Sequence, residues 1–180
     1  PTPSSAASDV YKRQVIYGAT GYTGKLVVEY MVKNYLDDNE VNWAIAGRSE
    51  EKLKSVKDVF GLTDSVNEIV VDSNDYESVQ NMVSQSKCIL TTVGPYQLYG
   101  LNILKACAET GVDYVDLCGE PAWMHQMIQE YNEIAKSSGA RIVFSCGFDS
   151  IPFDLGVYLL QKKVVTHQGN PAKNVRGRVR

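Results

Sequence analysis

Short apolar runs alternate with segments of helical periodicity along most of the chain. The apolar runs predict buried strands at residues 15–17, 42–46, 69–71, 88–93, 114–117 and 141–145. Apolar residues three and four positions apart predict helices at residues 23–35, 50–59, 76–84, 101–110, from 121 to a break at 137–139, and from about 150 to about 163. This order predicts an α/β protein, a doubly wound, Rossmann-type sheet of six parallel strands.

Two of these helices carry apolar positions that we expect to pack against the core. The first helix is expected to bury a stripe formed by Leu26, Val27, Tyr30 and Met31. The last helix is expected to contribute Leu155, Leu159 and Leu160.

The two ends of the chain differ in composition from the body. Residues 1–14 are small and polar, then charged where a central parallel strand should be apolar, which predicts a disordered or non-native tail. Residues 15–163 form the expected dinucleotide-binding domain. Residues 164–180 are basic and complete no element, so we expect a truncated linker towards an absent C-terminal domain.

Composition narrows the possible functions. Hydrophobic residues make up 44% of the chain and charged residues 22%, the proportions of a globular protein. The net charge of −3 argues against a nucleic-acid partner. Four cysteines stand singly in apolar stretches and predict buried thiols in a reducing compartment. With two histidines in the chain, we expect no metal site.

The turn after the first strand is the principal candidate site. Gly18, Gly21 and Gly24 are spaced G-x-x-G-x-x-G between that strand and the first helix. The first two let the backbone turn beside a ligand, and the third lets the helix pack close to the strand. Free N–H groups at the helix start suit a pyrophosphate. We therefore expect the cofactor to contact Gly18, Ala19, Thr20, Gly21, Tyr22, Thr23 and Gly24.

The residues after the second strand indicate which dinucleotide binds. An NAD site usually places Asp or Glu there to hold the ribose hydroxyls. Here the strand is followed by Arg48 and Ser49, with no carboxylate before Glu50. A guanidinium can hold a 2′-phosphate in a forked pair, and a serine hydroxyl can add a donor, so we predict NADP in preference to NAD.

Later strands supply the other candidates, because ligands of such sheets lie across the carboxyl ends of the strands. Asp72 can accept a hydrogen bond from the adenine amino group or cap its own loop. The turn after the fourth strand brings backbone and an aromatic ring towards the nicotinamide, through Val93, Gly94, Pro95 and Tyr96. Residues 147–156 are dense in turn residues and aromatics.

Five segments in order resemble the N-terminal half of the saccharopine dehydrogenase-like oxidoreductases: residues 18–24, 46–48, 93–96, 114–120 and 147–152. The resemblance covers about residues 15–163. It implies an NADP-binding domain, followed by a second domain in a chain more than twice this length. It also implies a role in lipid metabolism, since family members include lipid-droplet or membrane-associated proteins in animals and enoyl reductases in bacteria.

The resemblance sets further expectations for partners and location. We expect a small, lipid-like substrate, a cytoplasmic protein peripheral to membranes or lipid droplets, and a homodimer among the possible assemblies. The present fragment is expected to bind NADP(H) without catalysing a reaction by itself.

Two other functions stay open on the sequence alone. Tyr158 and Lys162 lie one helical turn apart, with Ser145 thirteen positions before the tyrosine, as in short-chain dehydrogenases. There the lysine lowers the tyrosine pKa, the tyrosine transfers a proton and the serine orients the carbonyl. Against this arrangement, Pro121 and a strand interrupt the helix expected before the serine. The other function is a non-catalytic NADP(H)-binding sensor or scaffold.

Overall fold

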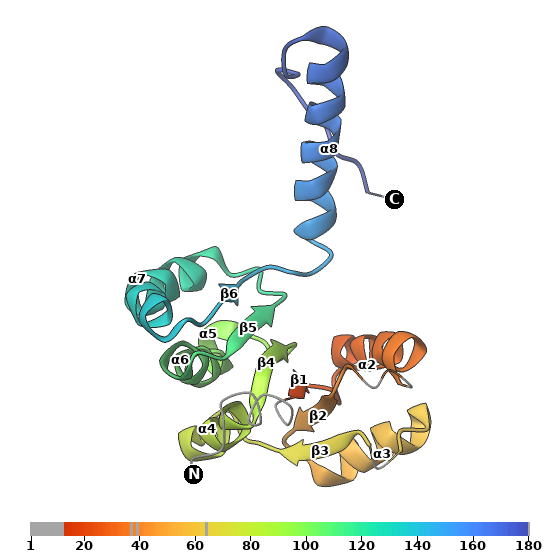
Figure 1. Cartoon of the computed structure of the whole chain (residues 1–180), viewed down its shortest axis with the longest axis vertical. Helices are drawn as coiled ribbons and strands as arrows, with labels where there is room; N and C mark the ends of the chain where they lie inside the picture. Colours follow the sequence, from red (N-terminus) through yellow and green to blue (C-terminus); the bar gives the residue numbers. More distant parts are fainter. Residues whose placement is uncertain (1–12, 37, 39, 64, 180) are drawn as a thin grey trace.

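A single parallel sheet organises the protein. The structure, a computed structural model, describes residues 13–36, 38, 40–63 and 65–179. In these residues six strands lie in the order β3-β2-β1-β4-β5-β6 (Figure 1). They are β1 (Arg13–Tyr17), β2 (Trp43–Gly47), β3 (Asn67–Val70), β4 (Ser86–Thr91), β5 (Asp113–Asp116) and β6 (Ile142–Val143). All neighbouring pairs are parallel, which confirms the doubly wound sheet.

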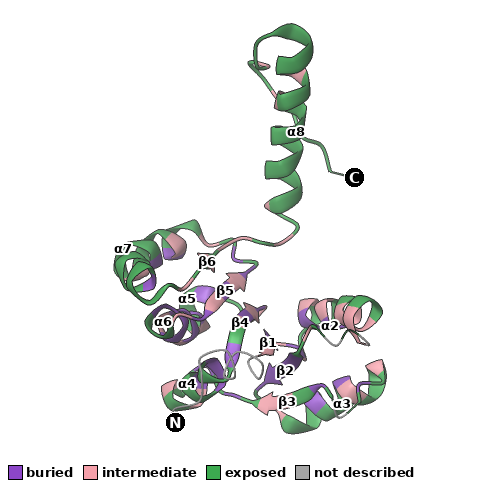
Figure 2. Ribbon diagram, viewed as in Figure 1, coloured by how far each residue is buried: buried purple, intermediate pink, exposed green. Residues whose placement is uncertain are grey.

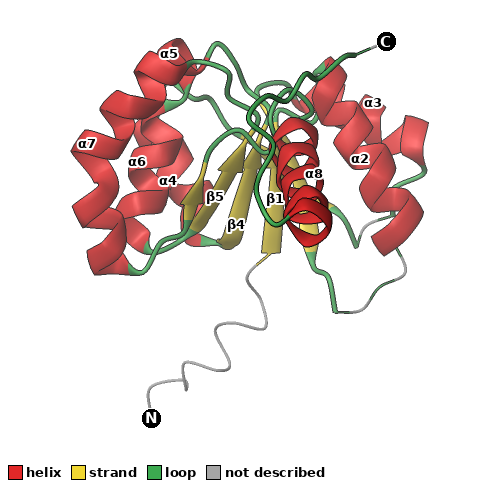
Figure 3. Ribbon diagram, turned by 90° about the horizontal axis from the view of Figure 1, so that it is seen from above, coloured by secondary structure: helices red, strands yellow, loops and turns green. Residues whose placement is uncertain are grey.

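Helices cover the two faces of the sheet and enclose two cores. One face carries α2 (Tyr22–Tyr35) and α3 (Glu50–Phe60); the other carries α4 (Tyr76–Ser84), α5 (Tyr96–Tyr99), α6 (Leu101–Thr110) and α7 (Pro121–Ser138) (Figure 3). Ile45 and Leu53 are fully buried in the first core, and Leu104 and Tyr114 in the second. Strands β1 and β2 are buried over most of their length, and the helices add buried residues on the sides that face the sheet (Figure 2). A central strand buried on both faces explains the continuous apolar run in the sequence.

Strand β1 begins earlier than the hydrophobic pattern indicates. Arg13 and Gln14 belong to it, and the Gln14 N–H donates to the Asn42 carbonyl at 2.9 Å. Only Val15, Ile16 and Tyr17 are buried, so the polar residues occupy the outer end of the strand. Residues 1–12 of the expected tail lie outside the described residues.

Strand β6 is shorter than expected, with two residues where the apolar run suggested five. Ser145 has φ 59°, in the left-handed region, and a strand cannot continue through that conformation. The short helix α5 was not predicted, because four residues are too few to show a helical period.

The last helix, α8 (Ile151–Gln168), extends away from the sheet and has no buried residue (Figures 1 and 2). The expected core packing of Leu155, Leu159 and Leu160 is therefore wrong for this structure, since each is 44% exposed or more. The described residues contain no helix with both the length and the apolar character needed to cross a membrane.

Two smaller expectations about burial are also corrected. Helix α2 buries Gly24 and Val28, whereas Leu26 and Tyr30 of the expected stripe are exposed. Cys107 and Cys118 are buried free thiols as expected, and Cys88 is partly buried, but Cys146 is exposed at the end of β6.

Candidate functional site

We call the region above the carboxyl end of β1, where the strand order reverses, the crevice. Strands β2 and β3 lie on one side of β1, and strands β4, β5 and β6 lie on its other side. Ligands of open α/β sheets bind where the strand order reverses in this way. The glycine turn predicted from the sequence begins at Gly18, directly after β1, and so lies at that point.

Gly18 is fixed by the two neighbouring strands. Its N–H donates to the Ala46 carbonyl at 2.9 Å, and its φ of 90° favours glycine. A Cβ atom at this position would lie 2.6 Å from the Thr92 hydroxyl oxygen and 2.8 Å from a Val93 methyl carbon. The turn is thus held between β2 and β4 with no room for a side chain.

The N-terminus of α2 faces the crevice without a capping side chain. Gly21 is its N-cap residue, and no acidic residue occupies the first turn. In contrast, Ser49 caps α3 and Asp75 caps α4 through side-chain oxygens. The first N–H groups of a helix have no partner within it, so at α2 they are available to an anion.

Gly24 allows α2 to approach the glycine turn. A Cβ atom there would lie 2.0 Å from the Gly18 carbonyl oxygen and 2.8 Å from the Ala19 Cα. Both neighbours are backbone atoms, which cannot move aside as a flexible side chain can. The third glycine therefore has a packing role, as the sequence indicated.

Arg48 and its neighbours occupy the β2 side of the crevice. Arg48 is exposed immediately after β2 and forms no ion pair with another described residue. The Ser49 hydroxyl oxygen accepts the Lys52 N–H at 3.3 Å, and the Asp72 carboxylate accepts the Asn74 N–H at 3.0 Å. Ser49 and Asp72 thus cap local structure, while the Ser49 hydroxyl hydrogen and the second Asp72 oxygen stay available to a ligand.

Tyr17 is a residue of this region that the sequence reasoning missed. Its hydroxyl donates to the Val71 carbonyl at 3.5 Å, below the loop that carries Asp72. Burial raises the pKa of Tyr17; the Asp72 charge also raises it, and the Arg48 charge lowers it. The phenol therefore lies within electrostatic reach of both groups. A tyrosine as the last residue of a buried strand was the signal that could have identified it.

The β4 side of the crevice is formed by the loop 92–95 and by Tyr96. A cis peptide bond joins Gly94 to Pro95. The Tyr96 hydroxyl donates to the Thr91 carbonyl at 3.1 Å, and its ring lies 5.7 Å from the Trp123 ring. Only 4% of Tyr96 is exposed, so the ring points into the core rather than towards the crevice as we expected. The contact of Tyr96 with a cofactor stays a prediction, and because the ring is buried we expect the backbone to make it.

A buried carboxylate links the ends of β5 and β6. Asp116 accepts hydrogen bonds from the Tyr114 hydroxyl at 2.8 Å and from the N–H groups of Cys118 and Ser145 at 3.0 and 2.8 Å. Burial raises the pKa of Asp116. These bonds hold Ser145 in its left-handed conformation. No local sequence pattern predicts this network, because its bond from Ser145 to Asp116 spans 29 positions.

The structure does not bring Ser145, Tyr158 and Lys162 together. The Ser145 hydroxyl donates to the Cys118 carbonyl at 2.7 Å, at the end of β6. Tyr158 is 60% exposed on α8, which leads away from the strand ends (Figure 1). No hydrogen bond between described residues connects any two members of this set.

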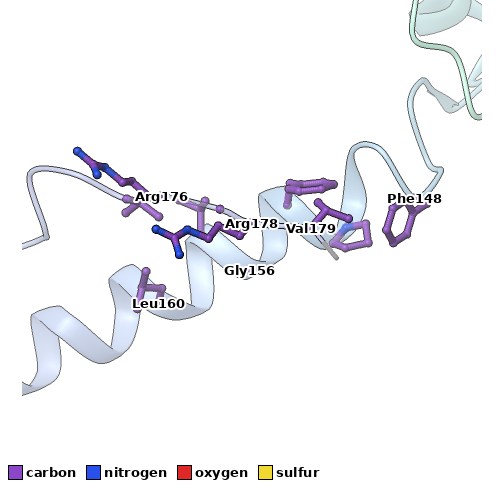
Figure 4. A pocket seen from close by; sticks show the side chains of 11 residues that line it. Phe148, Gly156, Leu160, Arg176, Arg178 and Val179 are labelled. Carbon is purple, nitrogen blue, oxygen red and sulfur yellow. The ribbon is translucent and has the colours of Figure 1, made fainter.

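A separate groove of about 470 Å³ lies between α8 and residues 175–179 (Figure 4). Its lining is mainly apolar and includes Phe153, Val157 and Leu160, with Arg176 and Arg178 from the extended segment. None of its lining residues belongs to the glycine turn or to strands β1–β5. The groove is therefore distinct from the crevice above β1.

The residues above β1 fit a dinucleotide with a 2′-phosphate. The uncapped start of α2 provides N–H donors that suit a pyrophosphate. Arg48 supplies a cation without a competing carboxylate partner in the described residues. These features suit NADP better than NAD.

Known relatives are similar to most of this chain. A protein from Caenorhabditis elegans named "Lipid droplet localized protein" is 44% identical over 157 residues, which cover 82% of this chain and 36% of the relative. A protein of Mycobacterium leprae named "Trans-acting enoyl reductase" is 41% identical over 152 residues, 84% of this chain and 36% of the relative. The chain thus spans about a third of the length of these curated relatives.

A solved structure supports the fold, and a family model identifies the family. A saccharopine dehydrogenase (L-Glu forming) from Saccharomyces cerevisiae superposes with a TM-score of 0.66 at 18% identity, over 88% of this chain and 32% of the other. That likeness shows the fold. The profile of the saccharopine dehydrogenase NADP binding domain matches residues 14–143. The chain belongs to the saccharopine dehydrogenase NADP-binding domain family, whose cofactor is NADP.

Proposed function

We propose that the full-length protein is an NADP-dependent oxidoreductase with a lipid-related substrate, and that this chain is its dinucleotide-binding half. The observation that supports it most is the uncapped N-terminus of α2 above β1, with Arg48 beside it. The relatives named as an enoyl reductase and as a lipid-droplet protein support the connection with lipids.

Each part of the crevice has a proposed role. The α2 start and residues 18–24 bind the pyrophosphate, Arg48 and Ser49 bind the 2′-phosphate, and Asp72 accepts a hydrogen bond from the adenine amino group. Residues 93–96 border the nicotinamide half. Bound NADPH supplies a hydride. We further propose that a second domain binds the substrate and supplies the proton donor.

The cofactor proposal is tested at Arg48. We expect Arg48→Ala to weaken NADPH binding by ~1.5–3 kcal/mol, which is roughly 10- to 150-fold, because a charge-assisted pair with the 2′-phosphate is lost. NADH has no such phosphate, so its affinity should change little. Isothermal titration of both cofactors measures the difference.

A matched control removes the same charge elsewhere. Lys33 lies in the last turn of α2 and pairs with Glu29 at 2.6 Å, at the opposite end of the helix from the crevice. Lys33→Ala should leave both affinities unchanged. Equal losses of NADPH and NADH in Arg48→Ala would show that Arg48 does not bind the phosphate.

Tyr158 distinguishes this proposal from a short-chain dehydrogenase. In a protein that carries both domains, we expect Tyr158→Phe to change turnover less than about twofold, because a residue 60% exposed on α8 is not built into the crevice. Loss of a general acid would instead lower turnover by ~10²–10⁴-fold. Steady-state turnover, measured with circular dichroism and cofactor loading as controls, decides between them.

The proposed function also indicates where in the cell the full-length protein is located. We place the whole protein in the cytoplasm at the surface of lipid droplets, on the support of the named nematode relative. Co-localisation of the tagged full-length protein with a lipid-droplet dye tests this, and a diffuse signal unchanged by lipid loading contradicts it.

A further inference from the structure

The carboxylate of Glu120 reaches from one strand end to the next. Glu120 lies in the loop between β5 and α7, where it is half-buried. Its Oε1 accepts the Tyr96 N–H at 2.7 Å, and its Oε2 accepts the Gln97 N–H at 2.9 Å. One side chain therefore holds two successive backbone donors of the loop that follows β4.

These two donors have no other acceptor available in their own helix. Tyr96 and Gln97 form the first turn of α5, whose N-cap residue Pro95 provides no side-chain hydrogen bond. The first N–H groups of a helix need an acceptor from outside it. A carboxylate is a strong one, because its charge shortens and strengthens the bonds.

Glu120 is itself held in place by the β5 end. Its N–H donates to the Cys118 sulfur at 3.4 Å, and the Cys118 N–H donates to the buried Asp116 carboxylate at 3.0 Å. The pair of bonds to α5 thus connects the loop after β4 to a fixed point in the core.

The loop after β4 borders the crevice on the side away from Arg48. Strand β1 has β2 on one side and β4 on the other. Arg48, after β2, marks the side of the 2′-phosphate. The nicotinamide half of a dinucleotide that crosses the crevice consequently lies over the end of β4, next to Gly94 and Pro95.

We propose that Glu120 is a positioning residue for the nicotinamide half of NADP(H), which it serves by holding the 93–96 backbone through the α5 N–H groups. The proposal rests on the function proposed above. Among the described residues, the carboxylate and the N–H of Glu120 form hydrogen bonds with Tyr96, Gln97 and Cys118, and none of these bonds is to a residue proposed for the adenosine half, so we expect its effect to be confined to one end of the cofactor.

The fold does not depend on Glu120 alone. The Tyr96 ring stays anchored by its hydroxyl bond to the Thr91 carbonyl, by the Leu117 N–H at 3.3 Å and by the Trp123 ring. Removal of the carboxylate therefore frees the loop backbone while α5 keeps its place against α7.

The test compares NADPH with adenosine 2′,5′-bisphosphate, which carries only the adenosine end of the cofactor. Glu120→Gln offers one acceptor and one clashing donor to the two N–H groups, so we expect NADPH affinity to fall about tenfold. The affinity for adenosine 2′,5′-bisphosphate should stay unchanged. Glu120→Asp keeps the charge but has a shorter side chain, so we expect a smaller loss of NADPH affinity and again no change for adenosine 2′,5′-bisphosphate. This variant tests the proposal if Glu120→Gln fails to fold.

Glu109→Gln is the matched control. Glu109 accepts the Tyr76 hydroxyl at 2.6 Å in the last turn of α6, and among the described residues it forms no hydrogen bond with residues 93–97. The Glu109→Gln variant should leave the affinities for NADPH and for adenosine 2′,5′-bisphosphate unchanged. Equal losses for the two ligands in the Glu120 variants, or no loss of NADPH affinity, would overturn the proposal. A wild-type protein that binds neither ligand would instead refute the proposed function.

Discussion

Replacement of Gly24 by alanine should lower the free energy of unfolding by about 3 kcal/mol, the upper end of what overpacking costs in a core. The new Cβ would lie 2.0 Å from the Gly18 carbonyl oxygen, with the Ala19 Cα and the Gly18 carbonyl carbon within 2.8 Å. The helix must move away from β1 to relieve these contacts. Since domains are stable by about 5–15 kcal/mol in total, the urea midpoint should fall sharply.

Gly119→Ala provides the control for this result. Nothing lies within 4 Å of a Cβ atom at Gly119, and its φ is outside the left-handed region. This variant should keep the wild-type midpoint. A Gly24→Ala protein with an unchanged midpoint would show that α2 does not pack as closely as the structure indicates.

Gly21→Val should reduce NADPH affinity by about 100-fold while the protein stays folded. The backbone at Gly21 has φ −76° and ψ 171°, an extended conformation that a β-branched residue adopts readily. A Cβ atom would lie 3.3 Å from the Gly18 oxygen, a close contact that a small shift relieves. The valine methyl groups would occupy the space above the α2 N-terminus, at a cost of about 1–3 kcal/mol to a bound pyrophosphate.

Titration with NADPH alongside a urea unfolding curve separates binding from folding. Gly18→Val is a useful contrast, because its side chain would collide with Thr92 and Val93 and should lower stability as well as affinity. A folded Gly21→Val protein with wild-type affinity for NADPH would refute the dinucleotide site above β1.

Much of the fold could be predicted from the sequence because parallel strands are buried on both faces. Ile45 and Ile89 lie in apolar runs whose lengths match β2 and β4 closely. The helix stripe was less reliable: Tyr30 has the right spacing in α2, yet it faces solvent. Periodicity identifies which residues share a helix face, but the partner that covers this face is set by tertiary contacts.

In the candidate site, too, local features could be predicted from the sequence and long-range contacts could not. The glycine turn is local, so spacing alone located Gly18 and Gly24 and assigned them roles that agree with their contacts. The bond between Asp116 and Ser145 and the bonds from Tyr96 and Gln97 to Glu120 join residues more than 20 positions apart, and no local pattern contains them. Tyr96 was expected to face the ligand because it follows a turn; its burial against Trp123 depends on a helix that starts 25 residues later.

The central place of β1 also affects how the chain is made on the ribosome. Strand β1 can pair with β2 soon after residue 47 has emerged, but its other edge pairs with β4, where Tyr17 lies opposite Thr91. At synthesis rates of about 5–20 residues per second, that edge waits roughly 2–10 s for its partner. An unpaired edge of a strand as apolar as Val15–Ile16–Tyr17 is a template for association with other chains. The nascent protein is therefore most vulnerable to aggregation in the interval between the synthesis of β2 and β4, when chaperone protection would have its greatest effect on yield.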